Sequence, residues 1–179
     1  MHSASLRGAP ALLIVILLCA GCGSSDSKVS AGTYVKSVCS AISPLSRDVS
    51  IRLNALNNTP APNATVAKKT LQGFLDAVEQ DSEHALSQLR SAGTPDISNG
   101  KSVSAAIVKT FSQLRDAMRV AVSKSQSLPT DSPSSFNAAA QALTTSVRGS
   151  LNKIDASGLS NPALEKAAST ESACRSLNS

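Results

Sequence analysis

Apolar residues recur at steps of three and four along most of the chain after residue 32, which is the period of an amphipathic α-helix. The pattern predicts five helical segments, separated by stretches rich in Asn, Pro, Gly and Ser. The apolar positions of these segments fall within residues 34–56, 66–89, 103–122, 136–154 and 164–177. Because no segment alternates apolar and polar residues or carries a run of β-branched residues, we expect almost no strand.

Residues with strong turn and capping preferences mark the ends of these segments. The run Asn57-Asn58-Thr59-Pro60 ends the first segment, and Gly93 stands where a C-terminal helix cap is expected after the second. Ser132-Pro133 has the order of an N-cap followed by a first-turn proline, and Asn161-Pro162 begins the fifth segment. Pro44 lies inside the first segment and removes a backbone hydrogen bond, so we expect a kink or a break there.

Short connections between amphipathic helices favour antiparallel neighbours. The sequence therefore predicts an all-α fold, an up-and-down antiparallel bundle of four to five helices. Its core is aliphatic and rich in alanine, because the whole chain has three Phe, one Tyr and no Trp. Small side chains allow helices to approach closely but bury less apolar area each, so we expect a covalent crosslink to matter for stability.

The apolar run near the N-terminus differs from these helices. It extends from Ala9 to Leu18, is interrupted by Pro10, and follows a region whose one fixed charge is Arg7. This is the organisation of a secretory signal peptide, and the run is shorter than the roughly 18 residues that a membrane-spanning helix needs. The segment Cys19-Ala20-Gly21-Cys22 comes next and resembles the lipobox of bacterial lipoproteins, with Cys19 where that motif usually has Leu. The resemblance implies cleavage before Cys22 and attachment of a diacylglyceryl group to its thiol.

These features divide the chain into three parts. Residues 1–21 are a lipoprotein signal peptide that is removed, residues 22–32 are a lipidated, flexible tether rich in Gly and Ser, and residues 33–179 are the helical bundle. We therefore expect a lipid-anchored protein on the extracytoplasmic face of the cell membrane. The alternatives are a plain secreted protein cleaved near the same place and a protein that keeps its N-terminal segment as an anchor.

Two cysteines remain in the predicted mature chain, Cys39 and Cys174. In an oxidising compartment such a pair predicts one disulfide, which would fasten the C-terminal end of the body to its first helix. Two distant thiols and one histidine supply too few ligands for zinc, so we expect no metal site and no other cofactor.

The chain carries 17 Lys and Arg against 12 Asp and Glu. Removing residues 1–21 takes away Arg7 and no acid, which leaves 16 basic and 12 acidic side chains and a net charge of +4. The charges are scattered, and Lys68-Lys69 is the densest basic spot, so we expect no nucleic-acid partner.

The second and third predicted helices carry opposite charges that would face each other if the helices were antiparallel. An antiparallel pair turning near Asp96 would place Glu79 beside Arg115 and Asp76 beside Arg119. We favour a ladder of surface ion pairs here over an acidic groove for a cation.

No catalytic motif stands out. His84 is the only histidine in the predicted mature chain, and it follows Glu83 on a polar helix face. No serine stands in a Gly-x-Ser-x-Gly motif or in a supported Ser-x-x-Lys motif. A solvated surface histidine is favoured over a catalytic one, and an envelope enzyme would have to depend on His84. The sequence indicates a protein that is not an enzyme.

Several segments together resemble the uncharacterised small helical-bundle lipoproteins of actinobacteria. These are the lipobox, the Ser-rich tether, residues 34–41, the loop 93–100 and the closing segment from Asn161 to Cys174. The resemblance covers most of the mature chain and implies a cell-envelope location and a Cys39–Cys174 bridge, but no activity. The anchor, the tether, the rigid bundle and the missing catalytic groups instead predict a membrane-anchored, non-enzymatic binding or interaction module, whose partner is an envelope protein or an apolar ligand. The alternative is a carrier of a small apolar or lipid ligand between its helices.

Overall fold

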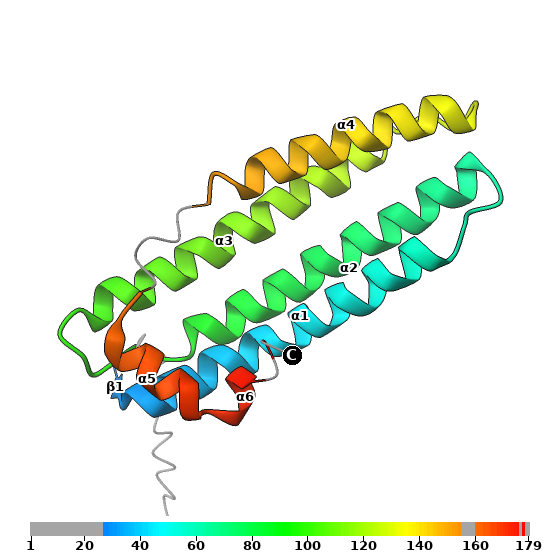
Figure 1. Ribbon diagram of the computed structural model, residues 1–179. Helices are drawn as coiled ribbons and strands as arrows, with labels where there is room; N and C mark the ends of the chain where they lie inside the picture. Colours follow the sequence, from blue (N-terminus) through cyan, green and yellow to red (C-terminus); the bar gives the residue numbers. More distant parts are fainter. Residues whose placement is uncertain (1–26, 155–159, 176, 178–179) are drawn as a thin grey trace, which may run out of the picture.

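The protein is a helical bundle in the computed structural model, which describes residues 27–154, 160–175 and 177 (Figure 1). The helices are α1 (Ala31–Asn58), α2 (Ala64–Arg90), α3 (Gly100–Ser125), α4 (Pro133–Leu151), α5 (Pro162–Thr170) and α6 (Ser172–Arg175), and the strands are β1 (Lys28–Val29) and β2 (Thr94–Pro95). The prediction of an all-α bundle with almost no strand is confirmed. The predicted signal peptide, residues 1–21, and the predicted lipidation site Cys22 lie outside the described residues.

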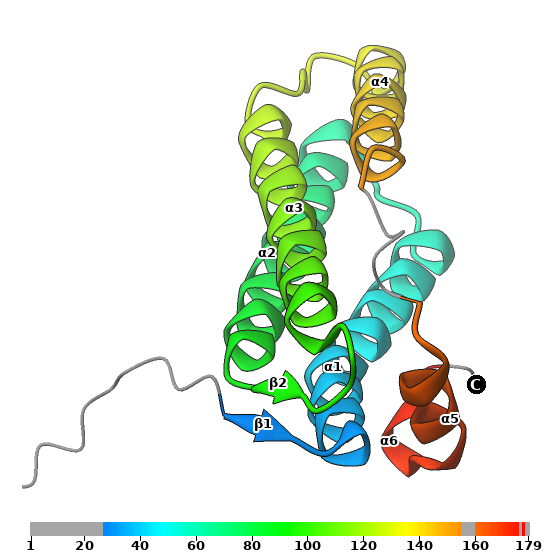
Figure 2. The ribbon, with the colours of Figure 1, turned by 90° about the vertical axis from the view of Figure 1, so that its left-hand side faces the viewer.

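Successive long helices run up and down and pack on their neighbours. Helix α2 returns along α1, α3 returns along α2, and α4 folds back along α3 (Figure 1). Helices α5 and α6 pack against α1 near its start, at the same end of the bundle as β1 and β2 (Figure 2). We call the end with β1, β2, α5 and α6 the base of the bundle.

Side-chain caps explain where most of the helices begin. The hydroxyl of Ser30 accepts a hydrogen bond from the backbone N–H of Thr33, and Asn63 caps α2 in the same way. Ser132 and Asn161 cap α4 and α5, and each is followed by a proline in the first turn. The predicted starts at Ser132-Pro133 and Asn161-Pro162 are therefore confirmed.

Helix α1 continues through Pro44 without a break. The sequence pattern predicted a kink or a break at this proline, and the prediction of a break is wrong. Cys39 and Ala41 are buried before Pro44 and Leu45 is buried after it, so both halves of the helix pack against the core. Burial on both sides outweighs the loss of one backbone hydrogen bond.

The N-terminal boundary of the folded body lies earlier than predicted. Strand β1 pairs in parallel with β2, Thr94 N donates to Ser27 O at 3.2 Å, and Asp96 N donates to Val29 O at 2.7 Å. The Lys28 ammonium also lies 3.0 Å from the Asp96 carboxylate. The backbone groups of the connection between α2 and α3 need partners, and β1 supplies them. The sequence pattern assigns residues 28–32 to the flexible tether of 22–32, whereas in the structure they are part of the folded body.

The core runs along the bundle in three adjoining clusters. The cluster at the base contains Tyr34, Val103 and Leu164, and the middle cluster contains Leu45 and Met118. The cluster at the far end contains Leu75, Ala121, Leu128, Phe136 and Leu143. No helix among the described residues is both long enough and apolar enough to span a membrane.

Candidate functional site

Cys39 and Cys174 form a disulfide with an S–S distance of 2.02 Å, as the sequence predicted. Cys39 lies in α1 and Cys174 in α6, and both are buried in the cluster at the base. The bridge attaches the C-terminal helices to the first helix. Since both thiols are consumed, the bridge supplies no free thiol.

An apolar groove of about 510 Å³ opens between the C-terminal part of α1, the first half of α2 and the second half of α4. We call it the α1/α2/α4 groove. Eight of its twelve lining residues are apolar, and the lining residues are Leu53, Leu56, Asn57, Leu71, Phe74, Leu75, Leu143, Thr144, Val147, Arg148, Leu151 and Asn152. Among the hollows on the described surface, this one has the most apolar lining that we find.

The groove exists because α4 leaves the end of α1 uncovered. Helix α4 packs mainly on α3 and more lightly on α2, and it has 19 residues against the 28 of α1. Its Phe136 and Leu143 are buried, whereas Leu53 of α1 keeps 43% of its surface exposed. The floor between them is formed by Leu75, which is buried, and by Phe74, which is half-buried. An apolar surface bounded by three helices is therefore left open to solvent.

The four polar members of the groove lining are all exposed, whereas Leu75 and Leu143 of the same lining are buried. Thr144 and Arg148 on α4 and Asn152, which caps the end of this helix, follow each other at four-residue steps and so form one stripe. Asn57 stands on α1 across the groove. Arg148 is the one charged residue in the lining, and no carboxylate of a described residue pairs with it.

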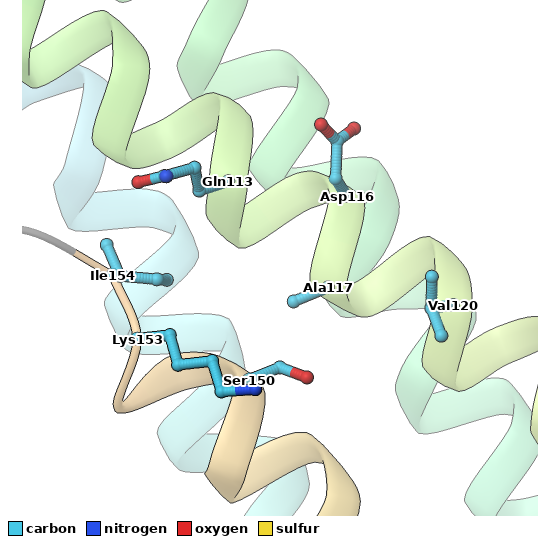
Figure 3. A pocket seen from close by; sticks show the side chains of 7 residues that line it. All are labelled: Gln113, Asp116, Ala117, Val120, Ser150, Lys153 and Ile154. Atoms are coloured by element: carbon cyan, nitrogen blue, oxygen red, sulfur yellow. The ribbon is translucent and has the colours of Figure 1, made fainter.

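A second hollow of about 340 Å³ lies between α3 and the end of α4 (Figure 3). Gln113, Asp116 and Val120 line it from α3, and Ser150 and Lys153 line it from the other side. In Figure 3 the Asp116 carboxylate points away from Ser150 and Lys153, and it lies 2.7 Å from the guanidinium of its neighbour in the chain. The polar groups that line this hollow do not converge on a common point, so we do not treat the hollow as a binding site.

The predicted ladder of ion pairs is present with a different register. Arg115 lies 3.1 Å from Glu83 and Arg119 lies 2.9 Å from Glu79, so the expected pairs Glu79–Arg115 and Asp76–Arg119 are wrong by about one helical turn. In both observed pairs the two residue numbers average 99. The antiparallel helices therefore reverse direction around residue 99, and not around Asp96 as predicted.

The shift of the ladder arises because β2 and the following turn carry the chain past the end of α2 before α3 begins. Most of the ladder's side chains are partly exposed, and the acids are neutralised by arginines. This fits a surface ladder and not an acidic groove for a cation. The described residues hold no group of three or more His, Cys, Asp or Glu that could bind a metal ion.

His84 is exposed on α2, as the sequence predicted. Its Nδ1 lies 3.3 Å from Nε2 of Gln88, one helical turn later. No hydroxyl of a described residue forms a hydrogen bond with the imidazole, so these residues give it no Ser or Thr to activate as a nucleophile.

The structure also brings together a carboxyl pair that the sequence analysis missed. Asp48 of α1 and Asp81 of α2 lie close enough to shift each other's pKa, and Arg52 contacts Asp48. The hydrogen bond from Arg52 lowers the pKa of Asp48, whereas burial, followed by the nearby carboxyl of Asp48, raises the pKa of Asp81. Oδ2 of Asp81 is buried with no hydrogen-bond partner. The sequence offers one sign of this burial. Asp81 stands three residues after Val78, and this spacing puts it on the same face of α2 as that buried residue.

No protein family, curated protein or solved structure matches this chain. The functional conclusion therefore rests on the sequence and the geometry of the molecule itself.

Proposed function

We propose that the protein is an extracytoplasmic lipoprotein, held at the cell membrane through Cys22, whose helical body is a non-enzymatic binding module. The ligand is a small molecule with an apolar chain, and it binds in the α1/α2/α4 groove. The observation that carries this proposal is the groove itself. Its volume of about 510 Å³ lies within the roughly 300–1,000 Å³ of typical small-molecule sites, and most of its lining is apolar.

Two further observations favour a bound small molecule over a catalytic site or a protein partner. The one histidine of the mature chain is exposed and has no hydroxyl partner among the described residues. Exposed apolar side chains outside the groove, such as Ile51 and Val120, are scattered over different helices, as on most soluble surfaces.

The anchor is supported by the lipobox-like segment that ends at Cys22 and by the short distance from there to the fold. Five peptide units join Cys22 to Ser27, and they span at most about 18 Å. A lipid on Cys22 would therefore keep the base of the bundle close to the bilayer surface.

Labelling with a tagged palmitate in bacterial cells that express the full chain tests the anchor. We expect label on the wild type and none on Cys22→Ala, together with accumulation of the unprocessed precursor when globomycin blocks lipoprotein signal peptidase. Unchanged processing and unchanged membrane association under globomycin would show that the protein is not a lipoprotein.

Photocrosslinking of the full chain in phosphatidylcholine vesicles tests the binding function. The probe is a photoreactive long-chain alcohol, which has an apolar chain and no charge. We expect crosslinks on peptides from 51–58 and 143–152, which border the groove. Val147→Trp fills the groove and reduces crosslinking, whereas Val120→Trp, a matched change on α3 in the second hollow, does not. Crosslinking spread evenly over the chain, or equally reduced by both variants, would refute the binding site.

A further inference from the structure

The α4 edge of the groove carries two parallel stripes. Leu143, Val147 and Leu151 repeat every four residues and belong to the apolar lining, while Thr144, Arg148 and Asn152 repeat every four residues one position later. An apolar stripe and a polar stripe therefore run side by side along one helix. This arrangement suits a ligand that is apolar along its length and polar at one end.

Arg148 is the strongest hydrogen-bond donor of the polar stripe. The hydroxyl of Thr144 donates to the carbonyl of Ala140 within α4, so it is already engaged. Arg148 is exposed and has no carboxylate partner among the described residues, whereas Arg52, Arg115 and Arg119 each contact an aspartate or a glutamate. The lining of the groove contains no acidic residue that could neutralise Arg148.

An unpaired guanidinium at the edge of an apolar groove selects for an anion. Its planar fork matches a carboxylate, to which it can donate two parallel hydrogen bonds. A phosphate monoester carries a charge between about −1.5 and −2 near neutral pH, more than a single arginine balances. A positively charged head group would be repelled.

We infer that the groove binds the carboxylate of a single-chain fatty acid, with the chain along the apolar stripe and the head group at Arg148. This inference rests on the proposed binding function and names the class of ligand. The observation that supports this inference is the distribution of charge in the lining. Arg148 gives the groove one positive charge, and the other lining residues are uncharged.

Competition against the photoreactive alcohol tests the inference on the full chain in phosphatidylcholine vesicles. Palmitate, hexadecanol and palmitoyl-lysophosphatidate are compared at equal mole fraction in the bilayer. We expect palmitate to displace the probe about tenfold better than hexadecanol, and this advantage to shrink as the salt concentration rises.

Substitution of Arg148 separates its charge from the apolar contacts. We expect Arg148→Gln to abolish most of the advantage of palmitate over hexadecanol. The matched control is Arg90→Gln, because Arg90 is also an exposed arginine in the last turn of its helix, away from the groove. This control should change neither ligand. Arg148→Glu should reverse the preference, so that hexadecylamine competes better than palmitate.

The possible results separate this inference from the function on which it rests. Equal competition by palmitate and hexadecanol in the wild type would overturn the role of Arg148 and leave the apolar site intact. An equal loss of palmitate competition in Arg148→Gln and Arg90→Gln would also overturn this role. Competition by lysophosphatidate about tenfold stronger than that by palmitate would overturn the choice of a carboxylate. Failure of every amphiphile to displace the probe would refute the proposed function itself.

Discussion

Among the charged residues that the structure describes, Asp81 has surroundings that disfavour its charge. One of its carboxylate oxygens is buried without a hydrogen-bond partner, and the nearby carboxyl of Asp48 adds a like charge. Arg52 and His84 lower the pKa of Asp81, but burial and Asp48 outweigh them and raise it above the ordinary 3.8. Arg52 and Arg47 favour the charged form of Asp48, so within the pair Asp48 ionises first.

The raised pKa predicts that Asp81 weakens the fold at neutral pH. Between about pH 3.8 and the raised pKa the folded protein holds more protons at this site than the unfolded chain does, so its stability falls as the pH rises through that window. Asp81→Asn keeps the shape and removes the charge. We expect a higher Tm than wild type at pH 7, and a difference that shrinks as the pH falls toward 3.8.

Thermal unfolding followed by circular dichroism from pH 3.5 to 7.5 measures this effect. Asp76→Asn, a change of another half-buried aspartate on α2, is the control for loss of a negative charge. A constant difference in Tm at every pH would show that the effect of Asp81→Asn does not come from titration.

At the scale of elements, the connection between α2 and α3 determines how these helices meet. Gly93 has a φ of +81°, which lets the chain turn directly after α2, and β2 then pairs with β1. At the start of α3, a Cβ on Gly100 would lie 1.9 Å from the carbonyl oxygen of Pro95. The backbone approaches itself closely at this point, and only glycine permits it.

Two glycine-to-alanine changes test this connection against an ordinary helix position. Gly100→Ala should lower the free energy of unfolding by about 1–3 kcal/mol, the usual cost of forcing extra atoms into a packed site. Gly73→Ala should raise it by about 0.5–1 kcal/mol, because Gly73 is exposed inside α2 and has nothing within 4 Å of its added Cβ. Urea unfolding of the full chain measures both, and similar effects from the two variants would contradict the close approach at Gly100.

Local patterns along the sequence were sufficient for some of these elements and not for others. Ser132 and Asn161 marked helix starts correctly because a cap and its N–H groups lie within three residues. The register of α2 against α3 depends on how the connection folds against β1, whose residues pair with residues 66 positions later in the chain. The same holds for the groove, since the spacing of Leu53 and Leu56 does not show which helix will cover them.

At the scale of the whole molecule, the disulfide joins regions that are 135 residues apart in the sequence. It holds α6 on α1 and so completes the cluster at the base, where Tyr34 and Leu164 are buried. The core has few aromatic side chains, and a crosslink that closes a long loop restricts the unfolded chain most strongly.

Replacement of both Cys39 and Cys174 by Ser should therefore lower the free energy of unfolding by about 2–5 kcal/mol. Chemical denaturation of the full chain measures the change. Treatment of the wild type with a reductant should produce the same destabilisation, and the same treatment should leave the double variant unaffected. Equal unfolding midpoints for wild type and variant would show that helix packing alone carries the stability.

The disulfide also makes the body a covalent ring from residue 39 to residue 174. A protease that cuts this ring once, at any position, opens it without releasing a fragment. The two pieces separate only on a gel run under reducing conditions. Cys22 lies on the N-terminal tail outside the ring, so a nicked molecule that carries the proposed lipid stays on the membrane with all of its helices. If the proposed anchor is present, the bridge keeps a nicked body attached to it, in addition to stabilising the fold.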